Sequence, residues 1–299
     1  MLKPLDKVED LIDLIAQVTD VPAERVHQRL RNEADEIGSN VSQAIREQNI
    51  PMYQMSEQLE QFYRDDDAFV YDSAVWNTCD AKQDMRDFIQ THLETHFPDK
   101  ASVFCFGDGL GFDSTWLAMK GHDVLYSEPS VRCRAFAHEV FRRNQVTVGE
   151  LDSIDDIQPE SLDAVVCLDV LEHVPQPEQF VRQFRRWLKP DGLLFVHAPF
   201  WFLHWTRPTH LAENRRLSGD LRNLYHAVGF TEVDALLFWN PIVLQRADRP
   251  NPLTPSVAAR MRIQVGRHLL RAGRWNSTIH SAIARFIARP PGSWKAALK

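Results

Sequence analysis

The sequence lacks any uninterrupted apolar run long enough to span a bilayer. The longest candidate, residues 192–205, is interrupted by His197, Pro199 and His204. The first residues turn acidic at once and lack the apolar stretch of a secretory signal peptide. We therefore expect a cytoplasmic location and no transmembrane segment.

Patterns typical of disulfides or metal ligands are also missing. The four cysteines are Cys79, Cys105, Cys133 and Cys167. None is paired at metal-ligand spacing, and the apolar neighbours of Cys105 and Cys167 predict small buried side chains. His92 and His96 stand four residues apart on an expected helix, but the H-E-x-x-H order and a third ligand are absent. We predict no metal site.

Basic residues are scarce at the beginning of the chain, and acidic residues are scarce at its end. Residues 1–99 hold 9 Lys/Arg against 21 Asp/Glu, whereas residues 246–299 hold 11 against 1, within a net charge of −7. An acidic chain argues against nucleic-acid binding. The basic end could lie on an anionic membrane surface, bind an acidic partner, or dock on the chain's own acidic beginning. We favour the last, because the charges nearly balance; the oligomeric state stays open.

The chain divides into three zones that differ in their sequence patterns. Residues 1–98 are typical of a helical lid or accessory region, residues 99–246 alternate short apolar runs with helical stretches, and residues 247–299 form a basic helical tail. The alternation predicts a parallel sheet covered by helices on both faces. The expected strands are 102–106, 123–126, 164–168, 193–198, 232–239 and 242–246, with helices at 82–96, 112–120, 131–142, 177–188 and 219–228.

Two details complete this outline. The last two strands are joined through Asn240-Pro241, which is too short for a crossover helix, so they should be antiparallel. The tail carries two apolar stripes at helical spacing. They consist of Val257, Met261, Val265 and Leu269, and of Ile279, Ile283 and Phe286.

The strongest signal is a glycine loop, Gly107-Asp108-Gly109-Leu110-Gly111, which leads from an apolar strand into a helix. Glycine permits a tight turn and a close approach of the backbone to a ligand. A tight turn without a ligand, or a dinucleotide site, would explain the loop equally well on its own. The next strand ends at Glu128, where a carboxylate can accept hydrogen bonds from a ribose diol.

Two further segments complete the set. They are Asp169-Val170-Leu171-Glu172-His173-Val174 and Leu188-Lys189-Pro190-Asp191-Gly192. Together with the glycine loop, the stretch 103–196 resembles class I S-adenosylmethionine-dependent methyltransferases with a D-x-L-E-H-V segment and an L-K-P-G-G turn. The resemblance covers roughly half of the chain, because it continues more weakly to Arg246. It implies a Rossmann-like, seven-stranded, mostly parallel sheet with a final antiparallel hairpin.

The resemblance also implies a cofactor, S-adenosyl-L-methionine, and residues that bind it. Gly107, Asp108, Gly109 and Gly111 would surround its methionine part, and Glu128 would bind the ribose hydroxyls. Glu150 would face the adenine amino group beside the Leu151 backbone, and Asp169 would lie near the sulfonium. In the lid, Tyr71 could reach the cofactor carboxylate. Those assigned residues are Gly107, Asp108, Gly109, Gly111, Glu128, Glu150, Leu151, Asp169 and Tyr71.

The chain departs from the family at Cys105, where an acid usually stands two residues before the first glycine. Asp108 could compensate for it in part. The departure keeps a second function open, a catalytically silent methyltransferase-like scaffold or partner subunit. A nucleotide-dependent reductase and a nucleic-acid methyltransferase fit the motifs less well.

The methyl acceptor would lie at the carboxyl ends of the strands. Methyl transfer needs alignment and, for some acceptors, a base, so histidines are the candidates. His210 is the first choice, because relatives often carry Pro-x-His in this loop, and His173 and His204 follow it. Trp201 and Trp205 could wall an apolar pocket, and Arg207 could bind an anionic acceptor group. We expect a methyltransferase acting on O or N of a small molecule or peptide.

Overall fold

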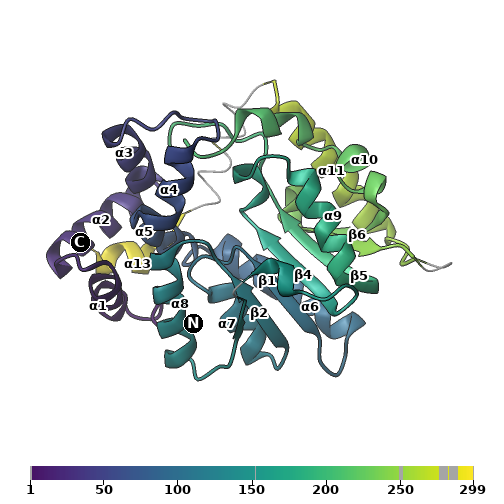
Figure 1. The fold of residues 1–299 in the computed structure, drawn as a ribbon, viewed down its shortest axis with the longest axis horizontal. Helices are drawn as coiled ribbons and strands as arrows, with labels where there is room; N and C mark the ends of the chain where they lie inside the picture. Colours follow the sequence, from purple (N-terminus) through teal and green to yellow (C-terminus); the bar gives the residue numbers. More distant parts are fainter. Residues whose placement is uncertain (1, 152, 249–251, 276–281, 283–288, 299) are drawn as a thin grey trace.

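The computed structural model describes residues 2–151, 153–248, 252–275, 282 and 289–298. Its centre is a seven-stranded sheet in the order β3-β2-β1-β4-β5-β7-β6 (Figure 1). The strands are β1 Ser102–Phe106, β2 Asp123–Ser127, β3 Gly149–Glu150, β4 Leu162–Leu168, β5 Leu188–His197, β6 Phe230–Ala235 and β7 Ile242–Arg246. Within the described ranges, no helix is long and apolar enough to cross a membrane.

The pairing of the strands confirms the expected fold class. β3, β2, β1, β4 and β5 pair in parallel, whereas β7 is antiparallel to both β5 and β6. The central strands bury both faces, as the nearly continuous apolar run of β4 predicts. The carboxyl ends of the parallel strands therefore meet at one edge, where open sheets bind their ligands.

Helices cover both faces of this sheet. The helices around it are α6 Asp80–His96, α7 Phe112–Met119, α8 Val131–Arg143, α9 Pro177–Trp187 and α10 Leu221–Leu224. One core joins Val165 and Leu194 to Phe184 of α9 and Leu224 of α10. The other core joins the opposite face to Met85 of α6 and to α7. The expectation of a sheet covered on both faces is confirmed.

The acidic beginning of the chain folds into helices beside α8 and above the ligand edge. These are α1 Val8–Thr19, α2 Ala23–Asp35, α3 Ser39–Glu47, α4 Glu57–Asp65 and α5 Ala68–Trp76. Leu11, Val26 and Tyr71 share one core with Phe136 of α8. Figure 1 shows α2 to α5 on one side of the sheet and α9 to α11 on the other.

Two local predictions were wrong. The expected helix 219–228 is one turn of α10 followed by the 3-10 turn η4 (His226–Val228), because buried Tyr225 leaves helical geometry at φ −116°. The expected strand 232–239 ends at Ala235 and continues into the 3-10 turn η5 (Leu237–Trp239). The Trp239 indole donates a hydrogen bond to the Ile263 carbonyl, so packing against the tail overrides the apolar pattern.

The tail docks in two places. α11 (Val257–Gly273) packs against β6 and η5, with Ile263 buried and Val257 and Met261 exposed. The charges predicted that the tail contacts the acidic beginning of the chain. α13 (Gly292–Ala297) makes this contact, because Lys295 lies 3.1 Å from Asp35. The second expected stripe, at Ile279, Ile283 and Phe286, lies outside the described residues.

Candidate active site

The glycine loop turns at the end of β1. Gly107, Gly109 and Gly111 have φ of 69°, 50° and 74°, in the left-handed region that favours glycine. A Cβ on Gly107 would lie 2.7 Å from Val170, and a Cβ on Gly111 would lie 2.7 Å from Phe141. At Gly109 the nearest atom to such a Cβ would be 3.6 Å away. Gly107 and Gly111 thus serve close packing, whereas Gly109 leaves its backbone open to the cavity.

Glu128 fixes this loop from the end of β2. Its carboxylate accepts hydrogen bonds from the backbone N–H groups of Gly109 (3.0 Å) and Ser130 (2.9 Å). A carboxylate can accept further bonds on its remaining lone pairs, so a ribose diol could still be bound. Burial raises the pKa of Glu128 to about 6.

Acids near Cys105 come from the loop and from α7. Asp108 accepts hydrogen bonds from the backbone N–H groups of Asp113 and Ser114 and so caps α7. Burial and the nearby Asp113 raise the pKa of Asp108 to about 7. Asp113 is paired with Lys82 at 2.9 Å. Asp108 within the loop and Glu128 after it therefore order the glycine loop. No acid at the strand position of Cys105 is needed for this.

Asp169 lies at the end of β4 and connects three parts of the molecule. It accepts hydrogen bonds from the Trp76 indole of α5 (2.9 Å) and from His197 Nδ1 at the end of β5 (2.7 Å). The Lys82 ammonium lies 3.6 Å away. Burial disfavours the charge of Asp169, yet His197 and Lys82 hold its pKa below its ordinary range. Asp169 is thus a fixed negative charge at the ligand edge of the sheet.

A cavity of about 1090 Å³ opens over this edge and is roofed by α3, α4 and α5. It brings together most of the residues predicted from the sequence. Its lining includes Gly107, Gly109, Glu128, Asp169, His173, Trp201, Arg207 and His210. Cofactor-loop and acceptor-loop residues therefore share one cavity.

Several predicted residues stand apart from that cavity within the described part of the chain. Tyr71 is buried in the apolar core of the N-terminal helices, with the Arg29 guanidinium 3.7 Å from its ring. Glu150 contacts His138 at 2.6 Å, and Trp205 is 47% exposed. Asp108, Gly111, Leu151 and His204 also lie outside the lining.

His210 is buried on the loop after β5, and its two nitrogens differ. The ring makes a hydrogen bond to the Phe202 backbone, while Nδ1 has no partner among the described residues. Since a carbonyl can only accept, the proton lies on Nε2 and Nδ1 keeps a lone pair. Burial and the neighbouring His173 hold the pKa of His210 well below its ordinary value. The neutral ring can therefore accept a proton.

His173 lies beside His210, with ring centres 4.7 Å apart. Its Nδ1 lies 3.2 Å from the Thr209 carbonyl and 2.9 Å from the Tyr63 hydroxyl of α4. The carbonyl favours the proton on Nδ1 and leaves the Nε2 lone pair towards Glu172, 3.9 Å away. Burial lowers the pKa of His173 to about 4.

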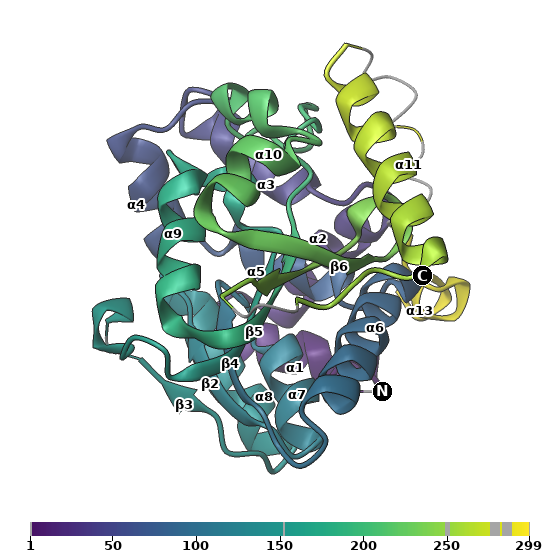
Figure 2. The same cartoon turned by 90° about the vertical axis from the view of Figure 1, so that its right-hand side faces the viewer.

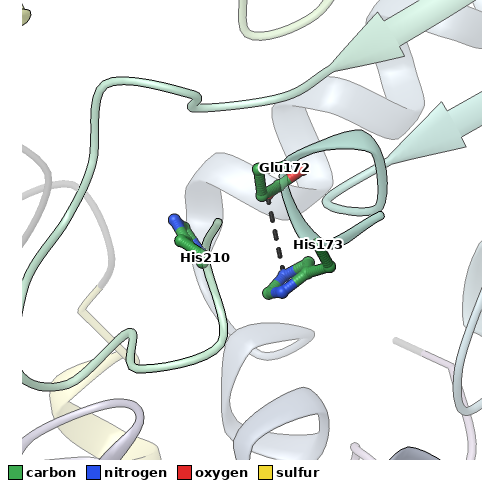
Figure 3. Close-up of side chains that lie close together, drawn as sticks. All are labelled: Glu172, His173 and His210. Atoms are coloured by element: carbon green, nitrogen blue, oxygen red, sulfur yellow. Dashed lines mark ion pairs between the residues drawn. The ribbon is translucent and has the colours of Figure 1, made fainter. Parts of the chain in front are cut away.

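Glu172, His173 and His210 form one cluster, shown in Figure 3, with the first two on the turn after β4. Their ligand atoms lie within 4.8 Å of one another, a spacing that could hold a metal ion. Burial and the nearby Asp169 hold the pKa of Glu172 well above its ordinary value. The set therefore fits a divalent cation only if Glu172 gives up its proton, and the absence of a metal site stays a prediction.

Arg207 connects the loop after β5 to the N-terminal helices. Its guanidinium donates hydrogen bonds to the Ile37 carbonyl (3.0 Å) and to Asp72 of α5 (3.2 Å). Both Arg207 and Asp72 line the cavity. Trp201, 8% exposed, lines the cavity as well.

Sequence reasoning assigned no role to five residues of this site. It missed Asp72, Lys82 and His197, and it named Tyr63 and Trp76 only as members of the expected lid segment. His197 could have been found, because it ends an expected strand at the ligand edge. The other four belong to the N-terminal helices, where nothing in the sequence indicates which side chains reach the sheet.

Comparisons with known proteins agree with this geometry. Residues 104–196 match the family model described as a methyltransferase domain. A ubiquinone biosynthesis O-methyltransferase of Idiomarina loihiensis is 35% identical over 112 residues, which cover 36% of this chain and 45% of the relative. The enzyme of that name from Xanthomonas campestris pv. campestris is 45% identical over 101 residues, 32% of this chain and 42% of the relative. The chain thus spans a little under half of these relatives.

Among solved structures, the 1,6-didemethyltoxoflavin-N1-methyltransferase of Burkholderia thailandensis has a TM-score of 0.43 at 19% identity, over 58% of this chain and 81% of that one. Magnesium protoporphyrin IX methyltransferase of Synechocystis has a TM-score of 0.44 at 18% identity, over 56% and 80%.

The sheet order and the glycine loop define a Rossmann-like methyltransferase fold. With the family match, the chain contains a class I S-adenosylmethionine-dependent methyltransferase domain. S-adenosyl-L-methionine is accordingly the cofactor of this domain. The matched stretch holds Gly107, Gly109, Glu128 and Asp169.

Proposed function

We propose that the protein transfers a methyl group from S-adenosylmethionine to an oxygen or nitrogen of a small molecule. The observation that carries the proposal is the single cavity of about 1090 Å³, which joins the glycine loop to two neutral histidines. S-adenosylmethionine supplies an activated methyl group when bound. Gly109 and Glu128 would hold the ribose end, and Asp169 would stand beside the sulfonium end.

The chain's own residues would position the acceptor and remove its proton. Trp201 and Phe202 offer apolar contact, and Arg207 with Asp72 closes the roof over them. Bound S-adenosylmethionine would supply the methyl group to the acceptor's oxygen or nitrogen and would leave as S-adenosylhomocysteine. The acceptor proton would pass to Nδ1 of His210, a buried nitrogen without a partner among the described residues, on a side chain that lines the cavity. His173 would orient His210 across their edge-to-face contact.

More specifically, we propose that the methylated atom is an oxygen. The curated relatives above are O-methyltransferases by name. A hydroxyl loses its proton more easily once a neutral base lies beside it, and both histidines are held in the neutral form. Peptide acceptors and nitrogen acceptors are the alternatives for a screen.

Isothermal calorimetry with S-adenosylmethionine and S-adenosylhomocysteine tests the cofactor site. We expect micromolar binding that Glu128→Ala weakens at least tenfold, about 1.4 kcal/mol. Glu139→Ala is the matched control, since Glu139 lies on the outer face of α8 and pairs only with arginines of that helix. A well-folded wild type that binds neither ligand would overturn the proposal. Binding without turnover on any acceptor would instead favour the scaffold function that Cys105 left open.

A further inference from the structure

α11 has two different faces. Ala259, Ile263 and Gly266 face the body of the protein, and a Cβ on Gly266 would lie 2.6 Å from the Trp239 ring. The opposite face remains outside at the edge of the molecule, beside β6 (Figure 2). The inner packing uses Ile263 together with the small residues Ala259 and Gly266, and it leaves the other face of the helix uncovered.

Those larger side chains form an exposed apolar stripe. Val257 is 74% exposed, Met261 64% and Val265 51%, at successive i, i+4 positions of one helical face. These three side chains extend over roughly 12 Å of helix. Trp275, two residues beyond the end of α11, is 91% exposed. Single exposed apolar residues are ordinary, but a continuous stripe marks an interaction surface.

The charge on this helix is of one sign. The sequence from 249 to 299 contains no Asp or Glu, and α11 carries four arginines, with a fifth directly after its end. These are Arg260, Arg262, Arg267, Arg271 and, at its carboxyl end, Arg274. Arg262 is paired with Asp234, and Arg271 and Arg274 donate to the carbonyls of Gly219 and Arg216. Arg260 is exposed beside the stripe and donates to the Pro255 carbonyl. An apolar stripe flanked by arginines matches a surface that is apolar inside and anionic at its rim.

We infer that the outer face of α11 binds an anionic lipid surface, with Val257, Met261, Val265 and Trp275 entering the interface. The exposed Arg260 would lie at the level of the headgroup phosphates, and tryptophan is favoured at this depth. Leu269 and Leu270 of the same helix line the large cavity. Binding by α11 would therefore place one wall of that cavity next to the membrane surface. The inference does not depend on methyl transfer.

Sedimentation of the full chain with vesicles tests it. We expect binding to vesicles of phosphatidylglycerol and phosphatidylcholine, weak binding to phosphatidylcholine alone, and at least a fivefold loss in 0.5 M salt. The triple variant Val257→Ser, Met261→Ser, Val265→Ser should lower the partition coefficient at least tenfold. Arg260→Gln should lower it less, since it removes one charge and no apolar area.

The matched control is Met119→Ser with Val131→Ser, because both side chains are 54% exposed and lie on other helices. This variant should bind vesicles as the wild type does. Equal losses in the two variants would overturn the inference, as would equal binding to anionic and neutral vesicles. A wild type that ignores vesicles but forms a dimer, which the triple variant disrupts, would assign the stripe to a second copy and also overturn it. Cofactor binding, measured in parallel, would stay unchanged in every variant and so tests the proposed function separately.

Discussion

The two sides of the cavity are built in different ways. On the cofactor side, Gly107, Gly109, Glu128 and Asp169 all follow the ends of neighbouring parallel strands. On the acceptor side, His210, Arg207 and Tyr63 come from loops and helices far apart in the sequence and meet only through tertiary contacts. The cofactor side is thus determined by short local segments, whereas the acceptor side depends on how the lid is placed.

Substitutions on the two sides of the cavity should therefore have different effects. Backbone hydrogen bonds hold the cofactor side, so its side chains affect binding and folding. The acceptor side offers neutral imidazole rings that line the cavity, so its side chains should affect rate. Three predictions test that contrast, in order of decreasing effect.

The largest effect is expected at the acceptor histidines. His210→Ala should lower kcat by about 10²–10⁴-fold, because the acceptor proton loses its base, while the dissociation constant for S-adenosylmethionine stays unchanged. His173→Ala should lower kcat less, since His173 orients the base. The measurement is steady-state kinetics beside calorimetry, with the solvent-facing His226→Ala as the control.

One outcome would contradict the role as a base. If chelators abolish wild-type activity and a divalent cation restores it, Glu172, His173 and His210 act as ligands. Both histidine variants would then lose cation affinity together.

The next effect concerns folding on the cofactor side. Gly111→Ala combines a left-handed backbone with a Cβ 2.7 Å from Phe141 and should lower the free energy of unfolding by about 3 kcal/mol. Gly121→Ala is matched in φ, at +94°, but its Cβ would meet nothing within 4 Å. It should cost about 1 kcal/mol. Urea denaturation measures both values, and equal losses would show that packing of α7 on α8 does not limit this position.

The smallest effect is a pH dependence of cofactor binding. Ionised Glu128 would accept hydrogen bonds from the ribose hydroxyls, and its pKa is raised to about 6. Affinity for S-adenosylmethionine should therefore be constant above about pH 7 and fall about tenfold per pH unit below pH 6. His173, with a pKa lowered to about 4, would stay neutral across this range.

Calorimetry from pH 5 to pH 8 checks this, with Glu128→Gln as the control. The Gln variant should bind weakly at every pH. A fall in affinity that survives in this variant would belong to Asp108, whose pKa is raised to about 7.

Sequence reasoning alone gave the sheet of this protein and the cofactor side of its cavity. Short apolar runs ended at the glycine loop, at Glu128 and at Asp169, and parallel strands necessarily bring such ends to one edge. It also predicted that His173 and His210 lie at the ligand edge of the sheet, and the structure places both at the cavity. It gave the wrong end for the strand at 232–239, because the indole of Trp239 packs on α11, a contact that periodicity cannot report.

Only the tertiary structure decided the rest. Lys82 and Trp76 reach Asp169 across 87 and 93 residues of sequence, and no local pattern encodes that meeting. Tyr71 turns into the core and away from the cavity, because α5 packs its buried side chains against α8. The apolar stripe of α11 predicted a helix but not which side would be buried. The face with Ala259, Ile263 and Gly266 is buried, since Gly266 lets the helix approach Trp239, and Val257, Met261 and Val265 stay exposed.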